Sequence, residues 1–176
     1  MLLHRDTFRE IRSVRDNNQK LHSPNIFWQY LGDTYLAYAA TAIRALADRN
    51  NRYPSISLAR LLAGIAENPQ AIPNESIRRC RLSNIDEVRQ MANEDLGSLV
   101  GELNAVKSFT DKMVAHYDEN PPESIPSFEE IDKCIDFLHK LYLKYDPVFH
   151  NRRLTSAKPT TQYSWQQIFR TPWLED

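Results

Sequence analysis

Residues 26–50 read IFWQYLGDTYLAYAATAIRALADRN and form the longest apolar stretch of the sequence. Its apolar side chains recur at helical steps of three and four residues, namely Phe27, Tyr30, Leu31, Tyr35, Tyr38, Ala39, Ala42, Ile43 and Leu46. This spacing places them on one face of an α-helix, and the alanines favour the helical conformation. We therefore expect a central, mostly buried helix that ends in the loop Asn50-Asn51-Arg52-Tyr53-Pro54.

The segments on either side of this helix also predict helices. Residues 7–21 carry Phe8, Ile11 and Val14 at helical spacing, and Ser23-Pro24 then suits the start of the central helix. After the loop, Ser57 is placed to cap a short helix over residues 57–68. Residues 68–82 contain two prolines and a basic cluster, and predict an irregular segment with one helical turn.

Two long helices follow. One is expected from Ser83-Asn84 to about Tyr117, with a break near Gly97. Its core stripe would comprise Leu99, Val100, Leu103, Val106, Phe109 and Met113. The other begins at Ser127, which forms a capping box with Glu130, and is expected to end at Asp146-Pro147.

No segment shows the alternation of a half-buried strand, and no internal repeat is present. The sequence therefore predicts an all-α fold, an antiparallel bundle of four to five helices over residues 1–155. Residues 156–176 are predicted to form a C-terminal tail whose apolar end, from Tyr163 to Leu174, anchors it on the bundle.

Composition limits the functions that remain. The chain has 176 residues and a net charge of −1 with both signs interspersed, which argues against a continuous nucleic-acid-binding coat. It has no apolar run of about 18 residues, and charged residues follow closely on Met1-Leu2-Leu3. We therefore expect a cytoplasmic protein with no membrane contact. Four glycines provide no Gly-rich phosphate loop, which excludes most nucleotide-dependent enzymes.

No metal or cofactor site is predicted. The five histidines lack the spacing of zinc ligands, and no GxSxG elbow is present. Cys80 and Cys134 lie far apart and are expected to be free thiols, with Cys134 in the core.

His116 is the histidine with the clearest chemical potential. It lies near the C-terminal end of a long predicted helix, where the helix dipole favours an imidazolium that could act as a general acid. The same position also suits a histidine that only caps the helix.

Basic and small residues offer further candidates. Arg78, Arg79 and Arg81 form one basic cluster and Arg152-Arg153 another, and either is suited to a phosphate backbone or to solvent. Gly97 and Gly101 predict a close helix–helix contact, either within the bundle or across a dimer.

The segment SFTDKMVAHYD (residues 108–118) resembles the signature segment of the HEPN superfamily, small helical bundles that include ribonucleases of toxin and phage-defence systems. Residues 47–62 resemble a helix junction in the abortive-infection branch of that superfamily. Residues 127–145 and 165–173 resemble its last helix and tail, in the same order.

The resemblance implies a metal-independent endoribonuclease, active as a homodimer, in which an RNA 2′-hydroxyl attacks the adjacent phosphodiester. It assigns His116 as the motif histidine and Asp111 as the polar residue, whereas Thr110 stands where the family has arginine. Threonine brings no charge and no bidentate fork, so we expect catalysis to be weakened or lost. Lys107 and Lys112 can supply positive charge beside the motif, and an arginine from another helix or from a dimer partner can replace the missing one.

The leading hypothesis is thus a HEPN-like protein of a phage-defence or toxin-type system that acts on or binds RNA. Two alternatives remain open. One is a non-catalytic interaction module that binds a cognate protein partner through the tail, and the other is an antitoxin-like regulatory subunit.

Overall fold

The computed structural model describes residues 1–49, 55–114, 119–122 and 124–170. Within these ranges the chain is helical and contains no strand, which confirms the predicted all-α class. Its α-helices are α1 (Leu2–Asp16), α2 (Ile26–Leu46), α3 (Leu58–Glu67), α4 (Asn74–Arg79), α5 (Ile85–Phe109) and α6 (Phe128–Phe149). Short 3-10 segments lie at Gln19–Leu21, Pro69–Ala71 and Trp165–Arg170, and a π-helical turn spans Thr110–Val114.

Side-chain caps mark the starts of α2, α3, α5 and α6. Ser57 accepts the backbone N–H of Arg60, and Ser127 forms the predicted capping box with Glu130. At α2 the prediction was wrong, because the cap is Asn25, which accepts the N–H of Phe27, rather than Ser23. The first helix is also shifted from its predicted range of 7–21, since α1 begins at Leu2 with no capping side chain.

The predicted stop at Pro147 is also wrong. Helix α6 continues to Phe149, with Pro147 inside its last turn. A proline there removes only one hydrogen bond, and the helix still closes through the His150 N–H, which donates to the Asp146 carbonyl. In addition, Arg79 Nε donates to the Pro147 carbonyl, so that this terminal oxygen has a partner.

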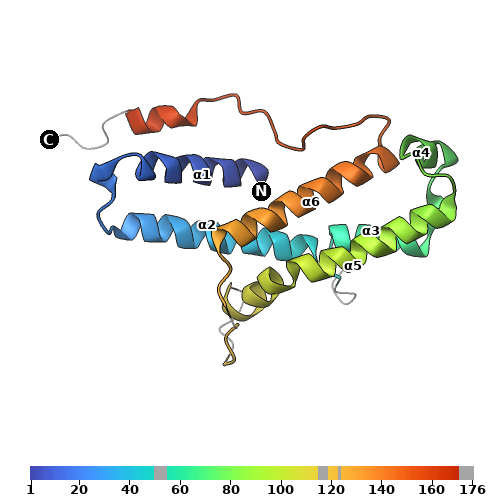
Figure 1. Ribbon diagram of the computed structural model, residues 1–176, viewed down its shortest axis with the longest axis horizontal. Coiled ribbons are helices and arrows are strands. Elements are labelled where there is room, and N and C mark those ends of the chain that lie inside the picture. The colour runs from blue at the N-terminus through green and yellow to red at the C-terminus, as the bar shows by residue number, and fades with distance from the viewer. Residues whose placement is uncertain (50–54, 115–118, 123, 171–176) are drawn as a thin grey trace.

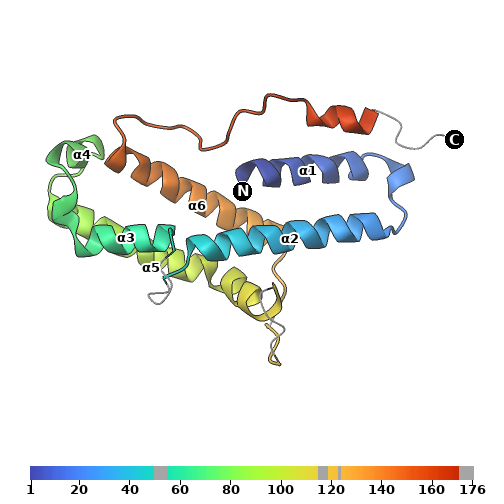
Figure 2. The ribbon, with the colours of Figure 1, turned by 180° about the vertical axis from the view of Figure 1, so that it is seen from behind.

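Helix α2 extends between two halves of an elongated molecule (Figures 1 and 2). Its C-terminal half lies near α3, α5 and α6, whereas its N-terminal half is covered by α1 and, beyond α1, by the C-terminal tail. The core is made of side chains from all six α-helices, including Phe8, Ile43, Leu62, Ile77, Leu99, Leu103 and Ile131.

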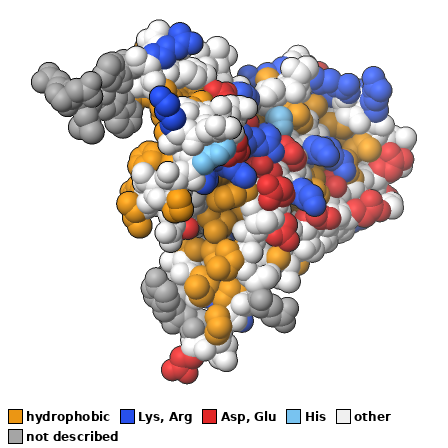
Figure 3. Space-filling model, turned by 60° about the vertical axis from the view of Figure 1, so that its left-hand side comes forward, with side chains coloured by type: hydrophobic (Ala, Val, Ile, Leu, Met, Phe, Trp, Pro, Cys, Tyr) orange, Lys and Arg blue, Asp and Glu red, His pale blue; other side chains and the backbone are white. Residues whose placement is uncertain are grey.

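The expectation that α2 is mostly buried holds only for its second half. Tyr35, Ala39 and Ile43 are buried, but Ile26 is 79% and Tyr30 67% exposed. The start of α6 reaches this half only near Gly32 and Tyr35, where the Phe128 ring lies, and Ile26 and Tyr30 stay exposed. Figure 3 views the molecule from that end and shows hydrophobic side chains exposed on the surface, with basic and acidic side chains intermixed beside them.

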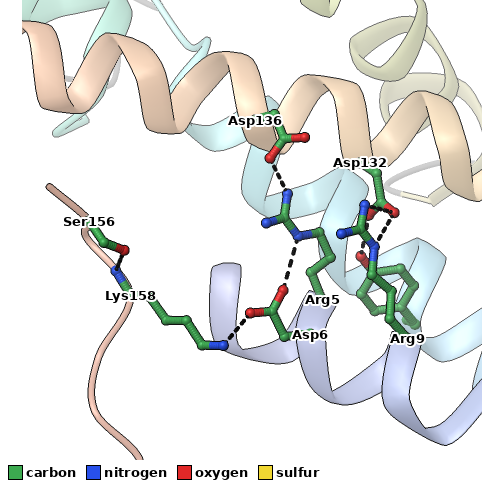
Figure 4. Close-up of polar contacts among 8 residues, drawn as sticks. Arg5, Asp6, Arg9, Asp132, Asp136, Ser156 and Lys158 are labelled. Carbon is green, nitrogen blue, oxygen red and sulfur yellow. Dashed lines mark hydrogen bonds and ion pairs between the residues drawn. The ribbon is translucent and has the colours of Figure 1, made fainter.

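Ion pairs connect α1 to α6 and to the tail (Figure 4). Arg5 pairs with Asp136 and Arg9 with Asp132, both on α6. On the other side of α1, Asp6 accepts from Lys158 of the tail. Further along, Gln166 donates to Glu10 at 2.7 Å. These polar contacts place the 3-10 segment Trp165–Arg170 beside α1.

The glycines of α5 do not make the contact predicted within the bundle. A Cβ atom at Gly97 or Gly101 would meet no other atom of the described chain within 4 Å, and both residues are exposed. Helix α5 also runs through Gly97 without a break. No helix in the described part of the chain has the length and apolarity to cross a membrane.

Candidate functional site

The motif segment lies where α5 changes into a π-helical turn at Thr110–Val114. Thr110 is only 1% exposed, and its Oγ1 donates to the Val106 carbonyl at 2.7 Å. A hydroxyl bonded in this way to the preceding turn does not face solvent. In this arrangement Thr110 has no access to a phosphate group.

Asp111 is held by two cations, one from its own helix and one from α2. Lys107 Nζ lies 2.7 Å from Asp111 Oδ2, and Arg44 Nε lies 2.7 Å from Asp111 Oδ1. We call these three residues the Asp111 cluster. Burial alone would raise the pKa of Asp111, but the hydrogen bonds and charges of Lys107 and Arg44 outweigh it and lower that pKa. Asp111 is therefore a carboxylate at neutral pH.

Arg44 brings a guanidinium to the motif segment from a different helix. It lies in the last turn of α2, and the hydrogen bond to Asp111 raises its pKa. Its side chain is 39% exposed, so that solvent reaches the group. A guanidinium presents a planar fork of N–H donors that matches phosphate oxygens, which neither Lys107 nor Thr110 can offer.

A polar hollow of about 290 Å³ lies along the same part of α5. Its lining comprises Asn104, Ala105, Ser108, Lys112, Pro122 and Ser124. Lys112 makes no hydrogen bond or ion pair with other described residues, and its ammonium is available to an anion there. The hollow is thus a polar recess at which the Lys112 ammonium has no ion-pair partner among the described residues.

An ideal helical wheel does not give the angle around the helix axis between Lys112 and His116. A wheel assumes 3.6 residues per turn, whereas the π-helical turn hydrogen-bonds from residue i to i+5 and widens the spacing. His116 itself lies outside the described residues. Single π-helical turns inside helices occur frequently at functional sites.

The basic cluster of Arg78, Arg79 and Arg81 lies at the C-terminal end of α4, far from the Asp111 cluster. Arg79 is engaged with Glu75, Ser76 and the Pro147 carbonyl. Arg78 and Arg81 are exposed, and their side chains make no hydrogen bond or ion pair with the rest of the described chain.

Other chemistry is not assembled in the described residues. No group of three His, Cys, Asp or Glu side chains there has the arrangement of a metal site. Both cysteines are free thiols, as predicted. Burial, reinforced by Glu102 and Glu130, raises the pKa of Cys134 to about 11, which keeps it a neutral thiol rather than a nucleophile.

Arg44 is the site residue that the sequence did not identify. It lies 67 positions before Asp111. The only available signal was a basic residue in the last turn of the apolar helix, and such residues are common because they complement the helix dipole.

The chain matches no protein-family model, no curated protein and no solved structure.

Proposed function

We propose that this chain is a HEPN-like protein of a phage-defence or toxin-type system, a metal-independent endoribonuclease with a weakened site. Asp111 and His116 would be its motif residues, and Arg44 would take the place of the motif arginine. The observation that carries the proposal is the ion pair between Arg44 Nε and Asp111 Oδ1. This ion pair brings an arginine from another helix to the motif aspartate. The proposal needs such an arginine because position 110 holds threonine where the family has arginine. His116 enters through its place in the sequence alone, five residues after Asp111.

The proposed reaction needs no group beyond these side chains and the RNA. The 2′-oxygen forms a bond to the adjacent phosphorus, and the bond from phosphorus to the 5′-oxygen breaks. His116 transfers protons between these oxygens, leaving a 2′,3′-cyclic phosphate and a 5′-hydroxyl. Arg44 stabilises the charge that develops on the phosphate oxygens. Because Arg44 is also paired with Asp111, that carboxylate offsets part of its positive charge. Arg44 then stabilises the phosphate less, and we expect the activity to be weak.

Cleavage of single-stranded RNA in the presence of EDTA tests this proposal. We expect slow cleavage by the wild type, none by His116→Ala, and about a hundredfold slower cleavage by Arg44→Ala. Arg89→Ala is the matched control, because Arg89 is an exposed arginine paired with Asp86 within one turn of α5. Products ending in 2′,3′-cyclic phosphate are expected. Cleavage that persists in His116→Ala, or a wild type that cleaves no RNA, would contradict the proposal.

The proposal includes a homodimer. The face of α5 that carries Gly97, Gly101, Ala105 and Ser108 offers small side chains, and no other described atom approaches its two glycines. A second copy of α5 can approach such a face closely and bring two motif segments together. Light scattering on the purified protein should give the mass of a dimer, and a strict monomer would argue against this part.

The non-catalytic alternative, a module that binds a cognate protein or serves as an antitoxin-like subunit, also has an observation in its favour. An apolar groove of about 510 Å³ lies between α1, α2 and the tail, with Ile11, Phe27, Leu31, Trp165 and Phe169 among its lining residues. A complex that survives His116→Ala but not removal of residues 156–176 would favour this alternative.

A further inference from the structure

Two arginine segments that are far apart in the sequence meet at one end of the fold. Arg153 Nη2 donates to the Arg79 carbonyl at 2.7 Å, and Arg79 Nε donates to the Pro147 carbonyl at 3.2 Å. Figures 1 and 2 show α4 beside the C-terminal end of α6. The basic clusters at residues 78–81 and 152–153 are therefore one surface.

The arginines of this surface divide into one that builds it and four that face solvent. Arg79 is fixed by Glu75, by Ser76 Oγ at 2.7 Å and by the Pro147 carbonyl. Arg78 and Arg81 are exposed, and their side chains make no hydrogen bond or ion pair within the described chain. The side chain of Arg152 is 58% exposed and reaches only to 3.8 Å from Asp146, while Arg153 is exposed and uses one nitrogen for the Arg79 carbonyl. We call Arg78, Arg81, Arg152 and Arg153 the arginine surface.

Positive charge is concentrated here. Residues 74–81 and 146–153 contain five arginines and two carboxylates, Glu75 and Asp146, which leaves three net positive charges. Because the whole chain has a net charge of −1, the remaining residues carry four more negative than positive charges. A polyanion is therefore attracted to this end of the molecule rather than to the rest of it.

The backbone at Arg81 holds an arginine where the local structure favours glycine. Arg81 has a φ of 60°, and it follows the C-cap of α4. The N–H of Leu82 donates to the Ile77 carbonyl and that of Arg81 to the Arg78 carbonyl, which together form a Schellman motif. Glycine is the usual residue at this left-handed position. Arg81 thus occupies this position at a backbone cost, while its exposed side chain makes no hydrogen bond or ion pair within the described chain.

Phe149 makes the surface suitable for a single strand, and Asp146 positions the segment that carries two of its arginines. Phe149, the last residue of α6, is 49% exposed and precedes Arg152 by three positions. An exposed aromatic ring on the segment that carries Arg152 and Arg153 offers a stacking platform for an unpaired base, which a duplex cannot use. Asp146 Oδ1 accepts from His150 Nδ1 at 2.9 Å, and its buried side chain thereby positions the segment that carries Arg152 and Arg153.

We propose that the arginine surface, with Phe149, binds single-stranded RNA by its phosphates and one stacked base. The choice of RNA rests on the proposed function. Arg78 and Arg81 lie just before the start of α5, and the Asp111 cluster lies at its C-terminal end. The two ends of this 25-residue helix are about 37 Å apart. The arginine surface is therefore a docking site remote from the site of cleavage.

Fluorescence anisotropy with a labelled single-stranded RNA of about 20 nucleotides tests the proposal. Log Kd should rise with log salt concentration, with a slope of about 0.7 for each phosphate contact. We expect Arg78→Ala, Arg152→Ala and Arg81→Gly each to weaken binding severalfold and to lower this slope by about 0.7. Phe149→Ala should weaken binding without changing the slope. Lys20→Ala, which removes an exposed cation beside α1 at the opposite end of the molecule, is the control and should bind as the wild type does.

Arg81→Gly separates binding from folding. It should keep or raise the melting temperature, since glycine suits the left-handed position, while it weakens RNA binding. Unchanged affinity in a variant lacking all four arginines, equal losses in Lys20→Ala, or tighter binding of duplex RNA would overturn the proposal. His116→Ala should bind RNA normally. If this variant binds RNA but does not cleave it, or if the wild type binds RNA without cleaving it, the result concerns only the proposed reaction. Neither result contradicts the docking site.

Discussion

Thr110 shows how one buried position constrains the candidate site. Its hydroxyl donates to the Val106 carbonyl, which also accepts the backbone N–H of the same residue. The side chain is enclosed by the bundle, so an arginine placed there would have to bury its charge or disrupt the turn. Arg44 of α2 is the guanidinium that reaches the neighbouring Asp111, and the proposed function assigns phosphate binding to it for that reason.

Thr110→Arg is accordingly expected to destabilise the fold rather than restore a stronger site. Burying an unpaired guanidinium should lower the free energy of unfolding by about 3 kcal/mol or more, measured by urea denaturation. Thr110→Val is the matched control and should cost about 1 kcal/mol, because the Val106 carbonyl keeps its backbone donor. Wild-type stability in Thr110→Arg would mean that the position opens to solvent.

Arg44 also shows why the site could be predicted only in part. The resemblance to the HEPN signature segment pointed to Asp111, and Lys107 and Lys112 were identified because they lie near it in the sequence. The sequence could not pair Asp111 with Arg44, since helical periodicity tells which face of a helix is buried and not which distant residue meets that face. The arginine surface was likewise visible only as two separate clusters.

Helix α6 depends on its N-terminal cap. The Ser127 side chain accepts the Glu130 N–H, and Glu130 accepts the Ser127 N–H at 2.7 Å. The same contacts lower the pKa of Glu130. Two backbone donors and one carboxylate are thus satisfied together at the start of the helix that connects α1 with α4 and α5.

We expect Ser127→Ala to lower the free energy of unfolding by about 1 kcal/mol, a shift visible in thermal denaturation. Ser127→Asp should retain most of the stability, because a carboxylate also accepts the N–H and suits the helix N-terminus. If both variants lost the same stability, the hydroxyl would not act through the cap.

At this scale the sequence predicted most of the elements. The caps at Ser57, Asn84 and Ser127 are local signals, and the starts of the helices that follow them were predicted correctly. The errors arose where distant contacts decide. Helix α1 begins at Leu2 without a capping side chain, stabilised by the partners of Arg5 and Phe8. Helix α6 continues past Pro147 to Phe149, and Arg79 of α4 donates to the Pro147 carbonyl in this last turn.

For the whole molecule, Asp6 connects α1 to the tail in a pH-dependent way. Burial would raise the pKa of Asp6, but hydrogen bonds and charge from Lys158 and Arg5 outweigh it and lower the pKa below 3.8. A group whose pKa is lower in the folded state stabilises the fold above its unfolded pKa. That contribution is lost as the pH falls through the folded value.

Lys158→Gln should therefore destabilise the protein at neutral pH, and the difference from the wild type should disappear as the pH falls through the lowered pKa of Asp6. Urea denaturation at a series of pH values, followed by circular dichroism, measures this difference. Lys140→Gln is the control, an exposed lysine of α6 without an ion pair in the described chain. A difference that persists unchanged in acid would show that Lys158 acts through something other than Asp6.

The ion pairs of α1 also have a consequence for synthesis on the ribosome. Arg5 meets Asp136 across 131 positions of the sequence, so that at about 5 to 20 residues per second its partner emerges about 7 to 26 seconds later. Until then α1 has only α2, through the stacking of Phe8 on Tyr35, whose ring centroids lie 4.0 Å apart. The nascent chain thus carries an exposed amphipathic hairpin during most of its translation, and early binding by a chaperone would protect it.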